Sequence, residues 1–213
     1  MMIELIRRDV SRAFHSGGIA LPVAFFLLVA TLYPFAVGPD GPLLAKTGGG
    51  ILWVAALLAA LLPVDRLIAH DAQSGVLDQL AVRGISDEVV AVSKIIAHWL
   101  GFGPPLMLAS IPAAALLRLD GATVINVEIG LALGTPGLAA LGVMTASLTV
   151  GLRGASAVTG LLMLPLAIPI LIFGAGSLGP SGAGGLKLLA AASLILVAIA
   201  PFATAAALKG LRG

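Results

Sequence analysis

Six long apolar segments constrain this chain more than any other feature of its sequence. A helix needs about 20 apolar residues to cross roughly 30 Å of hydrocarbon. Segments of that kind lie at 18–37, 48–64, 95–117, 124–150, 155–176 and 186–208, of which the second is the shortest. Only 10% of the residues are charged, against about a quarter in an ordinary soluble domain. We therefore predict an all-α integral membrane protein with six transmembrane helices, in a single domain over residues 1–213.

The basic residues predict how these helices are oriented. With the amino terminus inside, nine Lys and Arg residues fall on the cytoplasmic side and only Lys46, Arg118 and Lys187 fall outside; the nine are Arg7, Arg8, Arg12, Arg66, Arg83, Lys94, Arg153, Lys209 and Arg212. Such a bias is typical of cytoplasmic loops, so we expect both termini in the cytoplasm. The basic residues flank apolar spans at headgroup height and form no dense stripe on a polar face, so nucleic acid is not an expected partner.

The first 16 residues predict an amphipathic helix on the inner membrane interface. Apolar residues recur there at helical spacing, opposite a polar side: Ile3, Ile6, Val10, Ala13 and Phe14 against Glu4, Arg8, Ser11 and His15. A helix of this composition lies in the interface with its apolar face in lipid. An ordinary positively charged flank is the alternative.

The longest polar connection, residues 65–94, predicts a segment that docks another protein. Leu77, Leu80 and Ala81 are spaced to form an apolar face on a short helix that Asp71 could cap and Gly75 could break. Membrane helices reverse direction in a few residues, and loops well over a dozen residues long are usually functional or disordered. The alternative is a solvated loop that only joins two spans. After this segment, Ser86 is placed to cap a new helix.

Prolines inside the spans predict a bundle that moves. A proline in a helix removes one backbone hydrogen bond and bends the helix, and such breaks are tolerated where neighbouring helices satisfy the freed carbonyls. The candidate positions for conformational change are Pro104, Pro105, Pro136, Pro165 and Pro169. Gly130 and Gly134 form a GxxxG motif, which is weak evidence for close helix packing in so glycine-rich a chain.

The chain offers no catalytic centre. No carboxylate falls near the midpoint of a span, and Glu128 lies about one turn into the fourth span, where with Asp120 and Arg118 it is expected to mark the outer interface. The nearest approach to a P-loop, GPLLAKT at 41–47, lacks the second glycine. No nucleophile is paired with a base. We therefore expect no catalytic residue, and energy for any transport must come from another protein.

The sequence also offers no obvious metal or haem ligands. There are no cysteines, which excludes disulfides and thiolate metal sites. The histidines His15, His70 and His98 are not spaced to converge on one ligand. We expect no metal and no cofactor bound by this chain.

Seven stretches, in order along the chain, resemble the haem exporter protein B family (CcmB). They are TLYPFAVGPD at 31–40, GGGILWVAALLAALL at 48–62, DAQSGVLDQL at 71–80, KIIAHWL at 94–100, GTPGLAALG at 134–142, LPLAIPILIFG at 164–174 and PFATAAAL at 201–208. The resemblance implies the permease subunit of an ATP-binding-cassette (ABC) transporter complex for cytochrome c maturation, in the bacterial inner membrane. It also implies a six-span core similar to that of ABC-2-type exporters.

The resemblance further implies the partners. They are a second copy of the chain, a pair of cytoplasmic ABC ATPase subunits that bind ATP, a haem-handling membrane subunit with its small accessory subunit, and a periplasmic haem chaperone. Haem is then a possible cargo rather than a bound cofactor. ATP hydrolysis would drive haem export or delivery, or release of the haem-loaded chaperone. The absence of a tryptophan-rich haem-presenting segment favours chaperone release.

The resemblance also assigns residues to roles. The connection between the second and third spans would be the coupling helix in a groove of the ATPase, formed by Asp71, Gly75, Leu77, Asp78, Gln79 and Leu80. The outer segment would contact partners through Tyr33, Pro34, Gly38, Pro39 and Asp40. The alternatives are a drug or lipid exporter of the same fold and a membrane scaffold that transports nothing.

Overall fold

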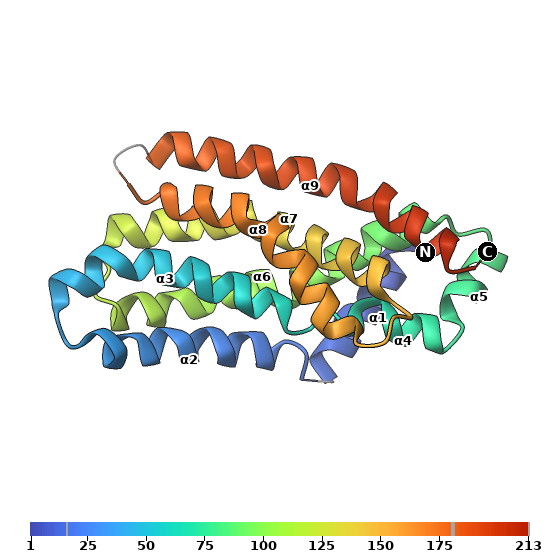
Figure 1. The fold of residues 1–213 in the computed structure, drawn as a ribbon, viewed down its shortest axis with the longest axis horizontal. Coiled ribbons are helices and arrows are strands. Elements are labelled where there is room, and N and C mark those ends of the chain that lie inside the picture. Colours follow the sequence, from blue (N-terminus) through green and yellow to red (C-terminus); the bar gives the residue numbers. More distant parts are fainter. Residues whose placement is uncertain (16, 180–181, 213) are drawn as a thin grey trace.

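The computed structural model of the protein describes residues 1–15, 17–179 and 182–212, which form a helical bundle without strands (Figure 1). Six of its helices are long and apolar enough to cross a membrane. They are α2 (Ala20–Val37), α3 (Gly41–Leu61), α6 (Asp87–Leu116), α7 (Gly121–Thr149), α8 (Ala155–Gly176) and α9 (Gly182–Gly210). The predicted all-α membrane fold with six spans is confirmed.

The prediction that the second span is the shortest is wrong. Helix α3 has 21 residues and begins at Gly41, whereas α2 has 18 residues. The early start has a local cause, because the Asp40 side chain accepts a hydrogen bond from the backbone N–H of Leu43 (3.2 Å) and Pro42 occupies the first turn. An acidic N-cap and an early proline both favour helix initiation.

Three shorter helices gather at one end of the bundle, which we call the basal end. They are α1 (Met2–His15), α4 (Arg66–Gln73) and α5 (Val76–Val82), and the last turns of α9 lie beside them (Figure 1). At the opposite, distal end lie the α2–α3 and α6–α7 connections, the last turns of α8 and the first turns of α9 (Figure 1). Both chain termini therefore lie at the basal end, as an even number of crossings requires.

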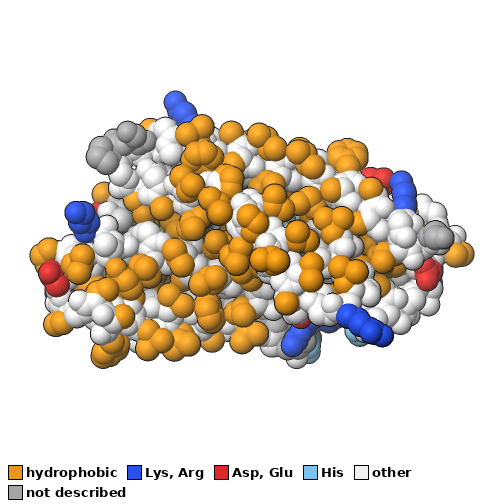
Figure 2. All heavy atoms as spheres, viewed as in Figure 1, with side chains coloured by type: hydrophobic (Ala, Val, Ile, Leu, Met, Phe, Trp, Pro, Cys, Tyr) orange, Lys and Arg blue, Asp and Glu red, His pale blue; other side chains and the backbone are white. Residues whose placement is uncertain are grey.

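An apolar belt surrounds the long helices. Figure 2 shows hydrophobic side chains spread over the visible face of the bundle, while charged side chains gather toward its two ends. Leu108 of α6, Leu161 of α8 and Leu194 of α9 are among the exposed large apolar residues. A monomeric soluble protein rarely exposes an apolar surface of this extent, so lipid is the solvent that this surface fits.

Helix α1 matches the predicted interfacial helix, except that Ser16, the last residue of the predicted segment, lies outside the described residues. On its predicted apolar side, Ile3 is 76% exposed and Phe14 64% exposed, while Ile6, Val10 and Ala13 are half-buried. Leu5 is buried. The helix packs against α6. It thus has one side on the bundle and one apolar side available to lipid.

Helix α7 is the centre of the bundle and packs against α6, α8 and α9. Its close packing depends on the fully buried Trp53 of α3. A Cβ atom added at Gly134 of α7 would lie 2.7 Å from Cη2 of Trp53, and one added at Gly174 of α8 would lie 2.5 Å from Cε2. Gly130, the other member of the GxxxG motif, also borders the indole. We call these three glycines the Trp53 socket; the GxxxG motif packs on Trp53 within the chain.

The candidate prolines all lie inside helices that continue through them: Pro104 and Pro105 in α6, Pro136 in α7, and Pro165 and Pro169 in α8. Helix α8 changes direction along its length (Figure 1), as a proline inside a helix favours. Next to Pro136, Thr135 accepts a hydrogen bond from Trp99 Nε1 (3.0 Å), which ties α7 to α6. The role of these prolines in movement stays a prediction.

The Trp53 socket predicts that Gly174→Ala destabilises the protein. The new methyl group would overlap a rigid buried ring, and overpacking of this kind costs about 1–3 kcal/mol. Thermal unfolding of the purified chain in one detergent measures the effect. Gly160→Ala in the same helix is the matched control, because a Cβ there meets no atom within 4 Å. Equal unfolding temperatures for the two variants would contradict the packing role of the socket.

Candidate functional site

The connection between α3 and α6 forms a helix–turn–helix at the basal end. Gly75 separates α4 from α5 with φ +69°, a left-handed conformation that favours glycine. The predicted break at Gly75 is therefore present. Asp71 does not cap α5, contrary to the prediction, since the N-cap residue is Gly75 and makes no side-chain cap. The Asp71 side chain lies in the last turn of α4 and is engaged elsewhere.

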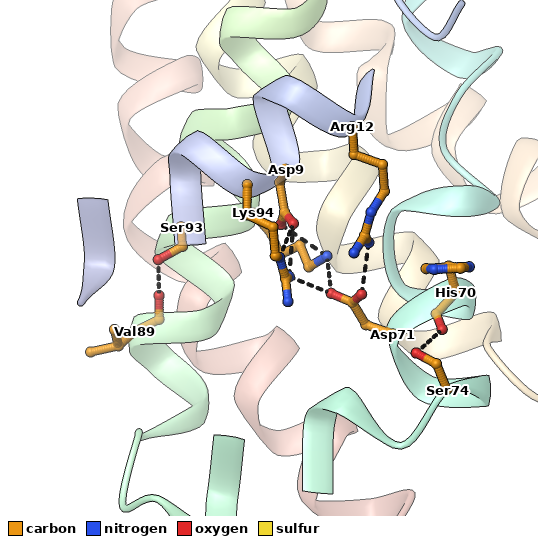
Figure 3. Close-up of polar contacts among 9 residues, drawn as sticks. Asp9, Arg12, His70, Asp71, Ser74, Val89, Ser93 and Lys94 are labelled. Atoms are coloured by element: carbon orange, nitrogen blue, oxygen red, sulfur yellow. Dashed lines mark hydrogen bonds and ion pairs between the residues drawn. The ribbon is translucent and has the colours of Figure 1, made fainter. Parts of the chain in front are cut away.

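Asp71 is fully buried and binds three cationic side chains from two other helices. Its Oδ1 accepts a hydrogen bond from Arg12 Nη1 of α1 (2.8 Å). Its Oδ2 accepts from Arg8 Nη2 of α1 (2.7 Å) and from Lys94 Nζ of α6 (2.5 Å). Figure 3 shows the carboxylate of Asp71 between Arg12 and Lys94. One carboxylate therefore joins α1, α4 and α6.

Asp9 of α1 completes this group, which we call the Asp71 cluster: Arg8, Asp9, Arg12, Asp71 and Lys94. Lys94 Nζ lies 3.0 Å from Asp9 Oδ2, and Arg8 Nε donates to Asp9 Oδ1 (2.8 Å). The cluster has three cations for two carboxylates. A buried charge is tolerated when it is paired and hydrogen-bonded, and both carboxylates here meet that condition.

The neighbouring charges shift the pKa values of Asp71 and Arg8. Burial alone raises the pKa of Asp71, but Lys94, Arg12 and Arg8 outweigh it and lower this pKa to about 2. For Arg8, burial opposes the charge, and the carboxylates of Asp9 and Asp71 nevertheless hold its pKa above the ordinary value. Asp71 lies in α4, beyond the end of the membrane-spanning α3. The Asp71 carboxylate is therefore ionised at neutral pH.

The sequence interpretation placed Asp71 on a docking surface and missed its interior role. A usable signal was present, since Arg8 and Arg12 are four residues apart and lie on one face of a helix. Two guanidinium groups on a face that packs against the protein require a carboxylate nearby. Nothing in the local pattern says which carboxylate supplies it.

The predicted docking residues of α5 divide between two sides. Leu77 and Leu80 are each only 8% exposed and face the interior. Asp78 and Gln79 are exposed, and Val82 is 89% exposed. Val82 was not among the predicted residues, although it follows Asp78 by four positions and so shares its side of the helix. We call Asp78, Gln79 and Val82 the α5 outer face.

The chain after α5 is tied to the end of α9. Ser86 caps α6 as predicted, its hydroxyl accepting from the backbone N–H of Val89 (3.4 Å). Two acidic residues in the next turn pair with basic residues near the carboxyl terminus. Arg212 pairs with Asp87, and Lys209 Nζ lies 3.4 Å from Glu88 Oε1. We call these four residues the α6–α9 clasp. Along the chain, α5 lies between Asp71 and the two acidic residues of the clasp.

The predicted outer-side residues lie in the last turns of α2 and in the α2–α3 turn at the distal end: Tyr33, Pro34, Gly38, Pro39 and Asp40. The Tyr33 hydroxyl donates to Thr47 Oγ1 (2.9 Å), which fixes α2 to α3. Gly38 has φ +90° and donates its N–H to the Pro34 carbonyl (3.0 Å). These contacts give most of the segment a structural role, and a partner contact there stays a prediction.

The histidines make separate contacts. The ring of His98 lies 4.7 Å from that of Phe102 between centroids, and His98 Nε2 borders Gly142 of α7. Among the described residues, Nε2 of His98 has no hydrogen-bond partner. His15 Nδ1 contacts the Ser11 carbonyl (2.7 Å), and His70 is exposed on α4. The described part of the chain holds no group of three or more His, Asp or Glu residues placed to bind a metal ion.

Comparisons with known proteins give a consistent match over nearly the whole chain. The family described as CcmB protein matches residues 1–210. The chain is 46% identical to Heme exporter protein B of Rhodobacter capsulatus, over 98% of both chains. It is 45% identical to the protein of the same name from Paracoccus denitrificans and 40% identical to that from Escherichia coli, again over 98% of both chains.

The Asp71 cluster predicts that Asp71→Asn releases α1 from the bundle. Breaking a buried ion pair costs about 3–5 kcal/mol, and partial exposure of Arg8 and Arg12 reduces this to about 2 kcal/mol. Amide hydrogens of α1 should then exchange roughly 30-fold faster. Hydrogen exchange with mass spectrometry measures this rate.

Asp78→Asn is the matched control, because Asp78 is an exposed carboxylate of the same connection. It should leave the exchange of α1 unchanged. If the amide hydrogens of α1 exchange at the same rate in the Asp71→Asn and Asp78→Asn variants, the cluster does not hold α1 on the bundle.

Proposed function

The chain belongs to the CcmB family, and from this premise we propose that it is the membrane permease subunit of an ABC transporter complex for cytochrome c maturation. The full-length match to proteins named Heme exporter protein B is the observation that carries the proposal. Haem is the proposed cargo of the pathway. The ATP-binding partner, rather than this chain, would hydrolyse ATP.

We propose the α5 outer face as the contact with the cytoplasmic ATPase. Its exposed position at the basal end supports this role, and Val82 offers an apolar anchor beside the polar groups of Asp78 and Gln79. Leu77 and Leu80 would act from the inside, by fixing α5 to the bundle. Gly75 would set the angle between α4 and α5.

The proposed coupling runs from α5 to the long helices through ionic contacts. Closure of the ATPase would push α5, and the Asp71 cluster would carry this force to α1 and α6. The α6–α9 clasp would carry it to α9. Bending at the prolines of α6 and α8 would then change the distal end, where haem-handling partners are expected.

The remaining partners follow from the family. We propose a second copy of the chain, a pair of ATPase subunits, a haem-handling membrane subunit with its small accessory subunit, and a periplasmic haem chaperone. The exposed Phe35 in the outer segment supports a partner contact at the distal end. The excess of basic residues at the basal end supports an inner-membrane orientation with both termini in the cytoplasm.

Release of a haem-loaded chaperone fits this chain better than passage of haem through it. Trp53 is enclosed by its glycine socket, and Trp99 donates its indole N–H to Thr135. His98 is buried against Phe102. The two tryptophans are thus committed to packing inside the bundle, which leaves them unsuited to presenting haem at a surface.

Haem staining of c-type cytochromes tests the proposed function. A bacterial strain that lacks its own permease of this family would receive this chain together with the matching ATPase subunit. Restored staining is the expected result. A stable membrane complex with the ATPase that restores no staining would contradict the role in cytochrome c maturation and favour an exporter of another cargo.

The α5 outer face predicts that Val82→Asp abolishes complementation while the protein still inserts and folds. The added charge would lie on a surface meant to enter a partner groove, whereas in the free chain Val82 is already open to solvent. Asp78→Arg should act in the same direction. Haem staining measures complementation, and size-exclusion chromatography of the tagged chain reports folding.

Leu152→Asp is the matched control. Leu152 is an exposed apolar residue in the α7–α8 connection at the same basal end, and the variant should retain staining. Retention of full staining by Val82→Asp and Asp78→Arg together would exclude the α5 outer face as the coupling contact.

A further inference from the structure

A cavity of about 320 Å³ lies at the basal end, beside the Asp71 cluster. It is bounded by α1, the start of α2, the turn after α3, the first turn of α4, and α6. Its charged side includes Asp9, Arg12, Arg66 and Lys94, and its apolar side includes Leu21, Leu62, Pro63 and Phe102. The cavity belongs to none of the contacts proposed above for the ATPase or the chaperone.

The charged side of the cavity has an excess of positive charge. Together with Arg8 and Asp71 behind it, four cations face only two carboxylates. Arg12 and Lys94 already bind Asp71. Arg66, in contrast, is exposed, and no acidic side chain in the described ranges pairs with it. A guanidinium group without a carboxylate partner, beside a second guanidinium, suits a phosphate oxygen.

The apolar side places the cavity at the level of lipid headgroups. Leu21 belongs to the first turn of α2, and Leu62 follows the last residue of α3, so both lie where the apolar belt ends. Gly101 places no side chain in the cavity. The nearest atom to an added Cβ would be Cγ1 of Ile19, at 3.9 Å. A ligand of this cavity therefore meets charge on one side and hydrocarbon on the other.

We propose that the cavity binds an anionic phospholipid of the basal leaflet, with the phosphate at Arg66 and Arg12 and the first acyl carbons against Leu21 and Phe102. A free phosphate ion would leave the apolar wall without a partner. A choline headgroup would bring a further cation to a site that already has an excess of them. The bound lipid would contact α1 and so stabilise the position of the same helix that the Asp71 cluster holds.

Native mass spectrometry of the purified full chain tests this inference. Phosphatidylglycerol and phosphatidylcholine with identical acyl chains are titrated separately. The expected result is one retained phosphatidylglycerol, bound about tenfold more tightly than phosphatidylcholine, and a loss of about tenfold in that affinity for Arg66→Gln. Arg7→Gln is the matched control, because Arg7 is an exposed arginine of α1 outside the cavity; it should change the affinity less than twofold.

A second variant and two competitors separate the possible ligands. Gly101→Leu should lower lipid binding by filling the cavity without a change of charge. Equal losses for Arg66→Gln and Arg7→Gln would show general attraction to anionic lipid and overturn the proposal. Displacement of the lipid by glycerol phosphate at equal concentration would assign the site to a free anion. Displacement by haem, with the same dependence on Arg66, would assign it to the cargo; either result overturns the lipid assignment.

Discussion

The basal end of this protein depends on one buried carboxylate. Asp71 binds Arg8, Arg12 and Lys94, and no water reaches its side chain to replace them. Because an unpaired charge in such a site is strongly unfavourable, α1, α4 and α6 keep their arrangement only together. These ion pairs determine the orientation of α5 and the charged wall of the basal cavity. The proposed transmission of force from α5 depends on them as well.

Beyond the Asp71 cluster, close packing rather than ion pairing holds the bundle together. Lipid is as apolar as leucine, so helices in a membrane associate by close packing and by hydrogen bonds. Here the indole of Trp53 sits against three glycines of α7 and α8, and Thr149 of α7 hydrogen-bonds Thr159 of α8 (2.5 Å). A closely packed α3–α7–α8 core, together with the Asp71 cluster at the basal end, fits the proposal that movement begins at α5.

The sequence predicted the features that a hydrocarbon solvent imposes and those that neighbouring residues determine locally. Six spans, the Gly75 break and the Ser86 cap follow from apolar length and short-range preferences. The start of α3 was placed at Gly48 because Lys46 and Thr47 interrupt the apolar run, although Asp40 and Pro42 initiate a helix before them. The partners of Asp71 lie 59 and 63 residues away on α1, and no local pattern encodes them. For the same reason, which side of α5 faces inward could not be read from its sequence.

The Asp71 cluster predicts that α1 and α4 move as one body in the proposed complex with the ATPase. The chain has no cysteine, so spin labels can be placed only where they are wanted. Ser11 on α1 and Ser74 after α4 are exposed and serve as one pair; Ser74 and Ala122 at the distal end serve as a second. Electron spin distance measurements on the complex, without nucleotide and with ATP trapped, should give an unchanged Ser11–Ser74 distance and a changed Ser74–Ala122 distance. A shift of the Ser11–Ser74 distance with ATP would contradict the account.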